Sequence, residues 1–490
     1  MSFGAFVNGK WYNPSNCQSM IKNINPANPD EIISEFPGAT AKDVQMAIEA
    51  AENAFLSWSN TPGPERGRIL LRAANIVRQR TEEIATTITK EEGKTIHESR
   101  GEVFKGLALL EYYAGEGFRM GGKTLPSEEQ DVFTFTIRNP LGVVALITPF
   151  NFPWANPMWK ACPALIAGNT VVFKPSEITP STASLMVEIF NDAGLPPGVL
   201  NMIIGLGRDV GDAIVEAPQI KAISFTGSNA VGTAINMKAA ALGKKVICEM
   251  GGKNAVVVLA DADLDQATEA IIGGAFGATG QRCTATSRII VMASVQEALL
   301  ERLISKANQL KIGNGLDETV DMGPAVTDIQ LSKDFSYIEI AKKDGAQLVC
   351  GGKKPKNLGN GYFIEPTIFK NVLPHMRIFQ EEVFGPVLSV TTAKTIDEAF
   401  NFANHVPYGL STAIFSQDIN CVMQYIKKAE VGMVHINEPT IGGEAQLPFG
   451  GIKATAIGDR EMSDEGLNFF THTKTVFLNY ANSAARSMMR

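Results

Sequence analysis

Short, almost wholly apolar runs recur between residues 142 and 250, and stretches with helical spacing separate them. The runs are Gly142–Thr148, Thr170–Lys174, Val199–Ile204, Ala222–Phe225 and Val246–Met250. Each run is of strand length and apolar on both faces, which is typical of strands buried within a parallel sheet. The segments between them, such as Ser181–Ala193 and Val210–Glu216, have helical periodicity. The sequence therefore predicts an α/β fold with a parallel, doubly wound sheet.

The regions on either side of these runs have different patterns. Residues 41–120 carry apolar residues at helical spacing and predict helices. Phe133–Arg138 alternates like a half-exposed strand, and Thr475–Leu478 has β character again. A second α/β series begins at Ala255–Leu259, includes a helix-like stretch at Ala267–Gly277 and continues to about residue 455.

The composition argues against several classes of protein. The 490 residues include 44 Lys and Arg against 51 Asp and Glu, so the net charge of −7 does not suggest a nucleic-acid binder. No apolar run is long enough for a membrane helix, and the N-terminal residues lack the pattern of a signal peptide. The six cysteines and five histidines show neither CxxC nor HExxH spacing. We therefore expect no metal site and a reducing, cytoplasmic location.

Cys283 has the most unusual surroundings of the six cysteines. It follows a glycine-rich stretch and lies in the segment Gly280–Thr286, directly after Arg282. A neighbouring guanidinium favours the thiolate, which is the nucleophilic form of cysteine. A buried structural role is commoner for a cysteine, but these small polar neighbours are poor core material. The pattern makes Cys283 a candidate nucleophile.

Two other candidate catalytic side chains stand at the ends of predicted strands. Glu249 closes an apolar run, which places its carboxylate at the edge of the sheet where ligands bind. Partial burial there would raise its pKa towards that of a general base, although a solvated glutamate fits the sequence equally well. Asn151 lies in a loop held by two prolines, so its amide could bind an oxyanion or cap a turn.

Three turns carry residues suited to a dinucleotide. Phe225–Ser228, with Gly232, joins a strand to a helix and could place an anion at the helix N-terminus. Lys174–Glu177 could contact ribose hydroxyls or a phosphate, or could be an ordinary charged loop. Gly205–Gly207, with Gly211, nearly matches the dinucleotide fingerprint, but its altered spacing is more typical of a turn.

Together these segments resemble the aldehyde dehydrogenase superfamily over nearly the whole chain. Seven motifs match in order: Thr148–Pro153, Lys174–Glu177, Phe225–Ser228 with Gly232, Glu249–Lys253, Gly280–Cys283, Glu381–Pro386 and Pro448–Lys453. The resemblance implies a Rossmann-type dinucleotide domain (1–119 and 140–250) and an α/β catalytic domain (251–458). It also implies a bridging β arm (120–139 and 459–490), which would join copies of the chain into a homodimer or homotetramer.

The resemblance implies NAD(P)-dependent oxidation of an aldehyde to a carboxylic acid. The thiolate of Cys283 would attack the aldehyde carbon, and the Asn151 amide with the Cys283 N–H would stabilise the oxyanion. Hydride transfer would leave a thioester, and Glu249 would activate the water that hydrolyses it. The presence of Glu249 argues against relatives that transfer the acyl group to coenzyme A. A non-catalytic member of the fold is a remote alternative.

The same resemblance implies which residues bind the cofactor. Lys174 and Glu177 would hold the adenosine ribose, and Glu382 and Phe384 would contact the nicotinamide ribose and ring. The full predicted set is Thr148, Pro149, Phe150, Lys174, Ser176, Glu177, Gly207, Gly211, Phe225, Thr226, Gly227, Ser228, Gly232, Met250, Gly251, Glu382 and Phe384. Glu177 favours the free 2′-hydroxyl of NAD, whereas Lys174, Ser176 and Arg208 would tolerate a 2′-phosphate. We expect NADP or NAD, with a slight preference for NADP.

The segment Gly280–Arg288 most resembles the branch of the family that oxidises 2-oxoglutarate semialdehyde (2,5-dioxopentanoate), and Asp459–Glu461 supports the same branch. A substrate ending in a carboxylate needs a cation; Arg282 is a candidate, or its side chain points away from the pocket. The predicted substrate residues are Phe152, Asn156, Trp159, Arg282, Thr284 and Phe449. Lys453–Gly458 departs from the family pattern, which leaves succinate semialdehyde, glyceraldehyde and broad specificity as alternatives.

Overall fold

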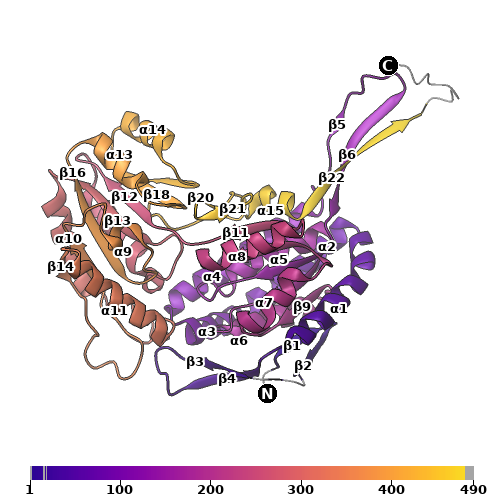
Figure 1. Ribbon diagram of the computed structural model, residues 1–490, viewed down its shortest axis with the longest axis horizontal. Helices are drawn as coiled ribbons and strands as arrows, with labels where there is room; N and C mark the ends of the chain where they lie inside the picture. Colours follow the sequence, from indigo (N-terminus) through magenta and orange to yellow (C-terminus); the bar gives the residue numbers. More distant parts are fainter. Residues whose placement is uncertain (1–2, 15–16, 18, 481–490) are drawn as a thin grey trace.

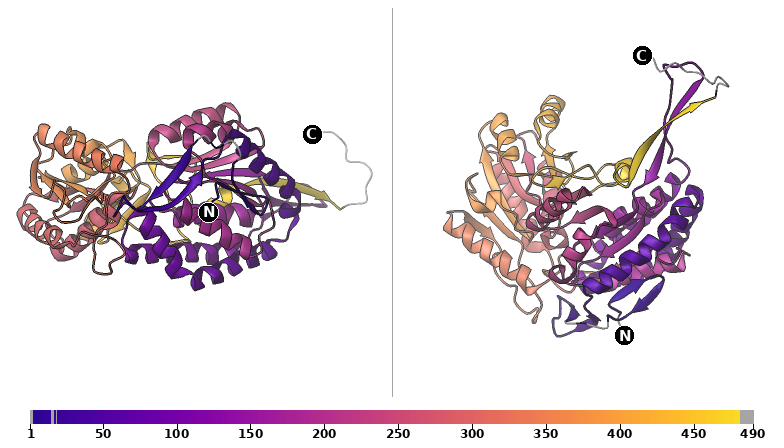
Figure 2. Two further views of the ribbon diagram at one scale, coloured as in Figure 1. Left: turned by 90° about the horizontal axis from the view of Figure 1, so that it is seen from below. Right: turned by 45° about the vertical axis from the view of Figure 1, so that its right-hand side comes forward.

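The computed structural model describes residues 3–14, 17 and 19–480, which form two α/β units with a β ribbon projecting from one of them (Figure 1; Figure 2). The sheet of the first unit has the strand order β2-β1-β9-β8-β7-β10-β11-β21. Its strands are β1 (Ala5–Val7), β2 (Lys10–Tyr12), β7 (Val143–Ile147), β8 (Thr170–Lys174), β9 (Leu200–Ile203), β10 (Ile220–Thr226), β11 (Lys245–Glu249) and β21 (Ala456–Ile457).

The five central strands, β7 to β11, are parallel, as the sequence predicts. Chain order reverses between β7 and β10, which makes this point the topological switch of a doubly wound sheet. The edges differ from the prediction, because β1 pairs with β9 and β21 with β11 in antiparallel fashion. These edge strands have only two or three residues, too few to show a periodicity in the sequence.

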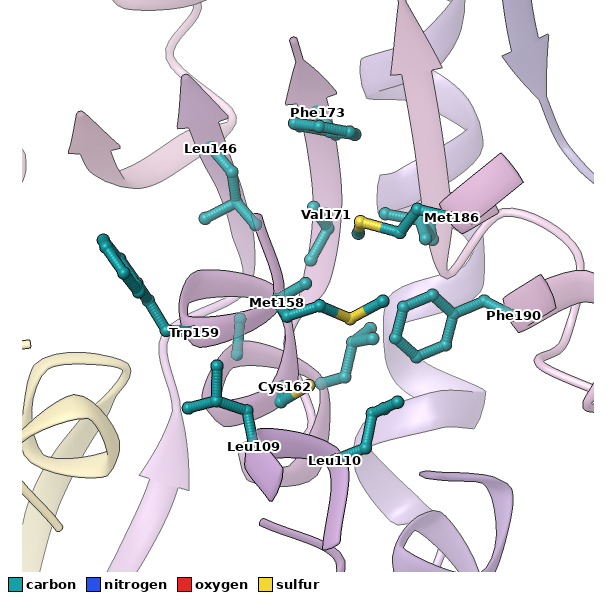
Figure 3. Close-up of a cluster of buried hydrophobic side chains, with 14 of the residues drawn as sticks. Leu109, Leu110, Leu146, Met158, Trp159, Cys162, Val171, Phe173, Met186 and Phe190 are labelled. Atoms are coloured by element: carbon teal, nitrogen blue, oxygen red, sulfur yellow. The ribbon is translucent and has the colours of Figure 1, made fainter. Parts of the chain in front are cut away.

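Helices cover both faces of the first sheet. They are α1 (Ala41–Asn60), α2 (Gly63–Gln79), α3 (Thr81–Glu92), α4 (Ile96–Glu116), α5 (Ala155–Ala167), α6 (Pro180–Asp192), α7 (Gly207–Glu216), α8 (Asn229–Ala241) and α15 (Ser463–Phe469). Leu146 of β7 packs with Leu109 of α4, Met158 of α5 and Phe190 of α6 (Figure 3). Its neighbour Ile147 packs in a separate core cluster on the opposite face. Burial of both faces explains why the strands are apolar throughout.

The second unit contains a seven-stranded sheet with the order β14-β15-β16-β13-β12-β18-β19. Its strands are β12 (Asn254–Val258), β13 (Thr286–Met292), β14 (Gln347–Cys350), β15 (Thr367–Lys370), β16 (Val387–Ala393), β18 (Ser411–Phe415) and β19 (Met433–Ile436). Its helices are α9 (Leu264–Phe276), the 3₁₀ helix η1 (Gly277–Gly280), α10 (Gln296–Gln309), α11 (Asp328–Lys343), α12 (Arg377–Gln380), α13 (Ile396–Asn404) and α14 (Ile419–Lys428). Two small sheets pair β3 (Met20–Ile24) with β4 (Ile32–Pro37), and β17 (Tyr408–Gly409) with β20 (Ile452–Lys453).

The projecting ribbon consists of β5 (Thr124–Leu125), β6 (Val132–Pro140) and β22 (Thr471–Asn479), with β6 in the centre (Figure 1). Both sequence segments expected to have β character, Phe133–Arg138 and Thr475–Leu478, lie in it. Of the predicted bridging segment 459–490, α15 packs on α5 instead, and residues 481–490 lie outside the described residues. In the part of the chain that the structure describes, no helix is long and apolar enough to cross a membrane.

Candidate active site

One pocket is lined by residues of both units, at the carboxyl ends of β7 and β10. This is the switch point of the first sheet, where open α/β sheets bind their ligands. Fourteen of the predicted site residues line it: Pro149, Phe150, Asn151, Phe152, Asn156, Trp159, Thr226, Gly227, Ser228, Met250, Gly251, Cys283, Glu382 and Phe384. Candidate residues from segments far apart in the chain therefore meet in one cavity.

Asn151 is held by both its side chain and its backbone. Its side chain is buried, and Nδ2 donates a hydrogen bond to the carbonyl oxygen of Gln281 over 2.9 Å. Its own carbonyl oxygen accepts a hydrogen bond of 2.6 Å from Nζ of Lys94. Because an amide nitrogen carries two hydrogens, one remains for a ligand in the pocket.

Cys283 lies in a constrained loop between η1 and β13. Ala278 and Thr279, just before it, have φ values of 48° and 57°, in the left-handed region that non-glycine residues rarely adopt. Nδ2 of Asn254 donates to the carbonyl oxygen of Cys283 over 2.8 Å. A Cβ on Gly252 would lie 2.4 Å from that oxygen, so only glycine fits there. The neighbouring backbone thus positions the thiol at the pocket.

The expected effect of Arg282 on the thiol is wrong. Burial, together with the nearby carboxylates of Glu249 and Glu382, raises the pKa of Cys283 to about 12. The Arg282 guanidinium pairs with Glu98, at 2.9 Å. Deprotonation of Cys283 therefore requires a proton acceptor at the site.

Glu249 ends β11 beside Thr226 of β10, behind the pocket wall. Its side chain is buried, and no side chain among the described residues hydrogen-bonds to its carboxylate, although the backbone N–H of Gly451 acts to lower its pKa. Burial raises the pKa of Glu249 well above its usual value; nearby Glu461 adds to the shift and Lys160 opposes it. A buried carboxylate with a raised pKa is suited to accept a proton.

A buried polar network lies next to Glu249 and includes residues that the sequence did not single out for catalysis. The carboxylate of Glu461 accepts hydrogen bonds from Lys160, from Oγ of Ser224 (2.8 Å) and from Nε1 of Trp159 (2.8 Å). Lys160 stands among mostly apolar residues in the fully buried helix α5. A lysine at such a position was a signal in the sequence for this network.

The residues expected at the nicotinamide end lie together and fit a cofactor there. Oε1 of Glu382 accepts a hydrogen bond of 2.7 Å from the N–H of Gly252. Phe384 has a φ of 65°, and its ring meets that of Phe150 edge-on at 6.0 Å. Ser228 precedes α8 without capping it, so the first amides of this helix are available to an anionic group. These features fit a dinucleotide lying across the switch point.

The other predicted cofactor residues do not line this pocket. They are Thr148, Lys174, Ser176, Glu177, Gly207, Gly211, Phe225 and Gly232. Nζ of Lys174 lies 3.3 Å from the Glu177 carboxylate, at the end of the strand next to β7. Gly232 has a packing reason, because a Cβ there would lie 2.5 Å from Sδ of Met250. Their cofactor roles stay predictions.

Three predicted substrate residues also lie outside the lining: Arg282, Thr284 and Phe449. Phe449 packs behind Trp159, with ring centroids 5.3 Å apart. Conversely, Gln330 and Lys333 of α11 line the pocket although no prediction included them. A polar residue on a helix is usually exposed to solvent, so the local sequence does not show that these two side chains line a pocket with residues from other parts of the chain.

Comparisons with known proteins agree with this architecture. The model of the aldehyde dehydrogenase family matches residues 11–476. An alpha-ketoglutaric semialdehyde dehydrogenase from Bacillus subtilis is 46% identical over 475 residues, which cover 96% of this chain and 97% of that protein. A 2,5-dioxopentanoate dehydrogenase from Saccharolobus solfataricus is 45% identical, covering 93% and 95% of the two chains.

A solved structure shows the same fold with a cofactor bound. The betaine aldehyde dehydrogenase from Staphylococcus aureus, in complex with NAD⁺, superimposes with a TM-score of 0.96 at 35% sequence identity. The match covers 100% of this chain and 97% of that one. The family model and the relatives each span nearly the whole chain. This chain belongs to the aldehyde dehydrogenase family and is an NAD(P)-dependent oxidoreductase.

Proposed function

We propose that Cys283, Asn151 and Glu249 are the nucleophile, the oxyanion donor and the general base of aldehyde oxidation. The observation that supports this most is their convergence. The Cys283 thiol and the Asn151 amide line one pocket, and the buried Glu249 carboxylate lies close enough to raise the pKa of the thiol.

In the proposed reaction, Cys283 loses its proton to Glu249 and its sulfur bonds to the aldehyde carbon. The oxygen of the resulting thiohemiacetal takes a hydrogen bond from the free Nδ2 hydrogen of Asn151. A bound nicotinamide cofactor supplies the acceptor for the hydride that leaves this carbon. Glu249 releases the proton it took from Cys283 to solvent. It then takes a proton from the water that attacks the thioester, the Cys283–carbon bond breaks, and this proton returns to the sulfur as the carboxylic acid leaves.

We propose 2-oxoglutarate semialdehyde as the substrate, with 2-oxoglutarate as the product. The names of the two relatives above support this choice. The Arg282 guanidinium lies 5.9 Å from the ring centroid of Phe152, which lines the pocket, and its Nε has no hydrogen-bond partner among the described residues. A partly free guanidinium beside the pocket suits a carboxylate at the far end of the aldehyde.

Replacing Arg282 with Ala tests this assignment. A hydrogen bond to a charged group contributes about 1.5–3 kcal/mol, so we expect KM for 2-oxoglutarate semialdehyde to rise roughly tenfold or more. KM for propionaldehyde, which lacks a carboxylate, should stay within roughly threefold because it makes no such bond. The measurement is NAD(P)H absorbance over a panel of aldehydes, with Arg302→Ala on the exposed face of α10 as the control. Equal effects on both aldehydes would exclude the carboxylate-binding role.

We infer that the cofactor is NADP or NAD, with a slight preference for NADP. Lys174 is buried at the end of β8 and pairs with the half-exposed carboxylate of Glu177. The carboxylate suits a free 2′-hydroxyl, whereas the ammonium suits a 2′-phosphate. The aldehyde panel should therefore be run with each cofactor separately. We also keep a cytoplasmic location as a proposal, since all six cysteines are free thiols.

We propose further that the ribbon of β5, β6 and β22 joins copies of the chain into a homodimer or homotetramer. It projects away from both units (Figure 1) and exposes large apolar side chains, among them Phe477 at 73% and Leu125 at 54%. Exposed apolar patches on an extended β ribbon favour association.

Replacing both Phe477 and Leu478 with Asp is expected to shift the protein to a smaller assembly. Two buried charges at an interface are costly, so the ribbon should no longer dock. Light scattering after size-exclusion chromatography measures the mass of each variant. Met237→Asp, at a site on α8 with 69% exposure, is the matched control and should leave the mass unchanged. An unchanged mass in the double variant would contradict the proposal.

A further inference from the structure

Lys94 is a fully buried lysine whose side chain reaches the backbone of the oxyanion loop. It lies in the short connection between α3 and α4, and its side chain is 1% exposed. Its Nζ donates to the carbonyl oxygen of Asn151 over 2.6 Å and to Oε2 of Glu102 over 2.8 Å. It also lies 4.2 Å from the ring centroid of Phe152. All these contacts are to residues in or beside the loop that follows β7.

Glu102 of α4 connects this lysine to the start of α5. Its Oε2 accepts from Lys94, while its Oε1 accepts from the N–H groups of Trp154 (2.8 Å) and Ala155 (3.0 Å). The side chain of Glu102 is completely buried, so both of its oxygens depend on these partners. Lys94 and Glu102 therefore hold the loop at both ends, at Asn151 and at the first turn of α5.

The backbone at Lys94 is itself fixed by the second unit. Gly93 has a φ of 97°, and a Cβ on Gly323 would lie 1.9 Å from its carbonyl oxygen. A Cβ on Gly315 would lie 2.3 Å from the carbonyl oxygen of Lys94, and the carbonyl of Gly315 accepts from the N–H of Ile96. The N–H of Lys94 is bound by Oε2 of Glu92 over 2.9 Å. The lysine thus connects a rigid inter-unit contact to the loop of Asn151.

We propose that Lys94, oriented by Glu102, is a positioning residue for the Asn151 amide during oxyanion stabilisation. This rests on the proposed role of Asn151. The Asn151 peptide is anchored at its carbonyl by Lys94, and its side chain is anchored by the carbonyl of Gln281. With both ends fixed, the remaining Nδ2 hydrogen has one direction, towards the pocket. A donor fixed before the reaction stabilises the developing negative charge without a reorganisation cost.

Lys94→Met tests the proposal, since methionine keeps much of the side-chain length and removes the ammonium. Loss of a whole oxyanion donor lowers kcat roughly 100- to 1,000-fold, so loss of its positioning should lower kcat roughly 10- to 100-fold. Affinity for NAD(P), measured by fluorescence titration without aldehyde, should stay within about twofold, because Lys94 does not line the pocket.

A double-mutant cycle with Asn151→Ala separates positioning from a general structural role. If Lys94 acts through the Asn151 amide, Lys94→Met in the Asn151→Ala background should change kcat by less than about threefold. The same fold-loss in both backgrounds would overturn the proposal, as would an unchanged kcat in Lys94→Met alone. Full activity of Asn151→Ala would instead refute the proposed role of Asn151.

Two further variants keep the test decisive. Lys94→Met leaves the buried carboxylate of Glu102 without its partner and could fail to fold for that reason. The double variant Lys94→Met/Glu102→Gln removes both charges, and the glutamine oxygen can still accept hydrogen bonds from the N–H groups of Trp154 and Ala155. The same cycle is then run with this pair. Lys244→Met is the matched control. Lys244 also donates to backbone carbonyls, those of Val215 and Ala217, and it directly precedes β11, at the end of this strand opposite to Glu249. The control variant should leave kcat unchanged.

Discussion

Replacing Cys283 with Ala is expected to eliminate aldehyde-dependent NAD(P)H formation, lowering kcat by roughly 10⁴-fold or more. The sulfur is proposed to form the covalent bond to the substrate, and among the described residues no other cysteine lines the pocket. Cofactor binding should persist, because the cofactor contacts proposed here come from other side chains. The measurement is the rate of absorbance change with saturating aldehyde and cofactor, together with a cofactor titration of the variant.

The control for this variant is Cys421→Ala. Cys421 is partly exposed on α14 and hydrogen-bonds to Asp418, in the second unit and outside the pocket lining. It should retain the full rate. Turnover of Cys283→Ala at the rate of the unaltered enzyme would refute the covalent mechanism, whereas loss of both turnover and cofactor binding would point to misfolding.

Replacing Glu249 with Gln is expected to lower the steady-state rate by roughly 100- to 10,000-fold, the usual range for loss of a general base. Glu249 is proposed to accept the proton of Cys283 and later a proton from water, so formation of the acyl-enzyme and its hydrolysis should both slow. Rapid-quench mass spectrometry would follow both steps through the added acyl mass on the peptide that contains Cys283. Glu269→Gln, on an exposed part of α9, is the control and should show neither effect. Full turnover without an acyl-enzyme would contradict the assignment of Glu249.

The role of Glu249 also predicts how kcat depends on pH in the unaltered enzyme and in Glu249→Gln. Glu249 acts as a base only when ionised, and burial raises its pKa well above the usual value for glutamate. The kcat of the unaltered enzyme should therefore rise with pH through that raised pKa and then level off. This rising limb should be missing from Glu249→Gln, because glutamine does not titrate.

Much of the fold follows from local patterns in the sequence. The run Thr170–Lys174 is a strand with the same bounds in the structure, because a short apolar run closed by a proline has few alternatives. The antiparallel edges β1 and β21 were missed, since so few residues carry no periodic signal. The site residues were found through motifs, whereas Gln330 and Lys333 belong to none of the motifs that match the family.

Local patterns in the chain were enough to predict the central strands, most helices and the chemical identity of the candidate residues. Which charges meet became visible only in the folded protein. Arg282 pairs with Glu98 rather than with its neighbour Cys283, and Lys94 reaches Asn151 across the interior of the protein. The physical reason is that a pKa or a buried ion pair depends on distance and desolvation in space. Residues far apart in the chain set both, and no local pattern records them.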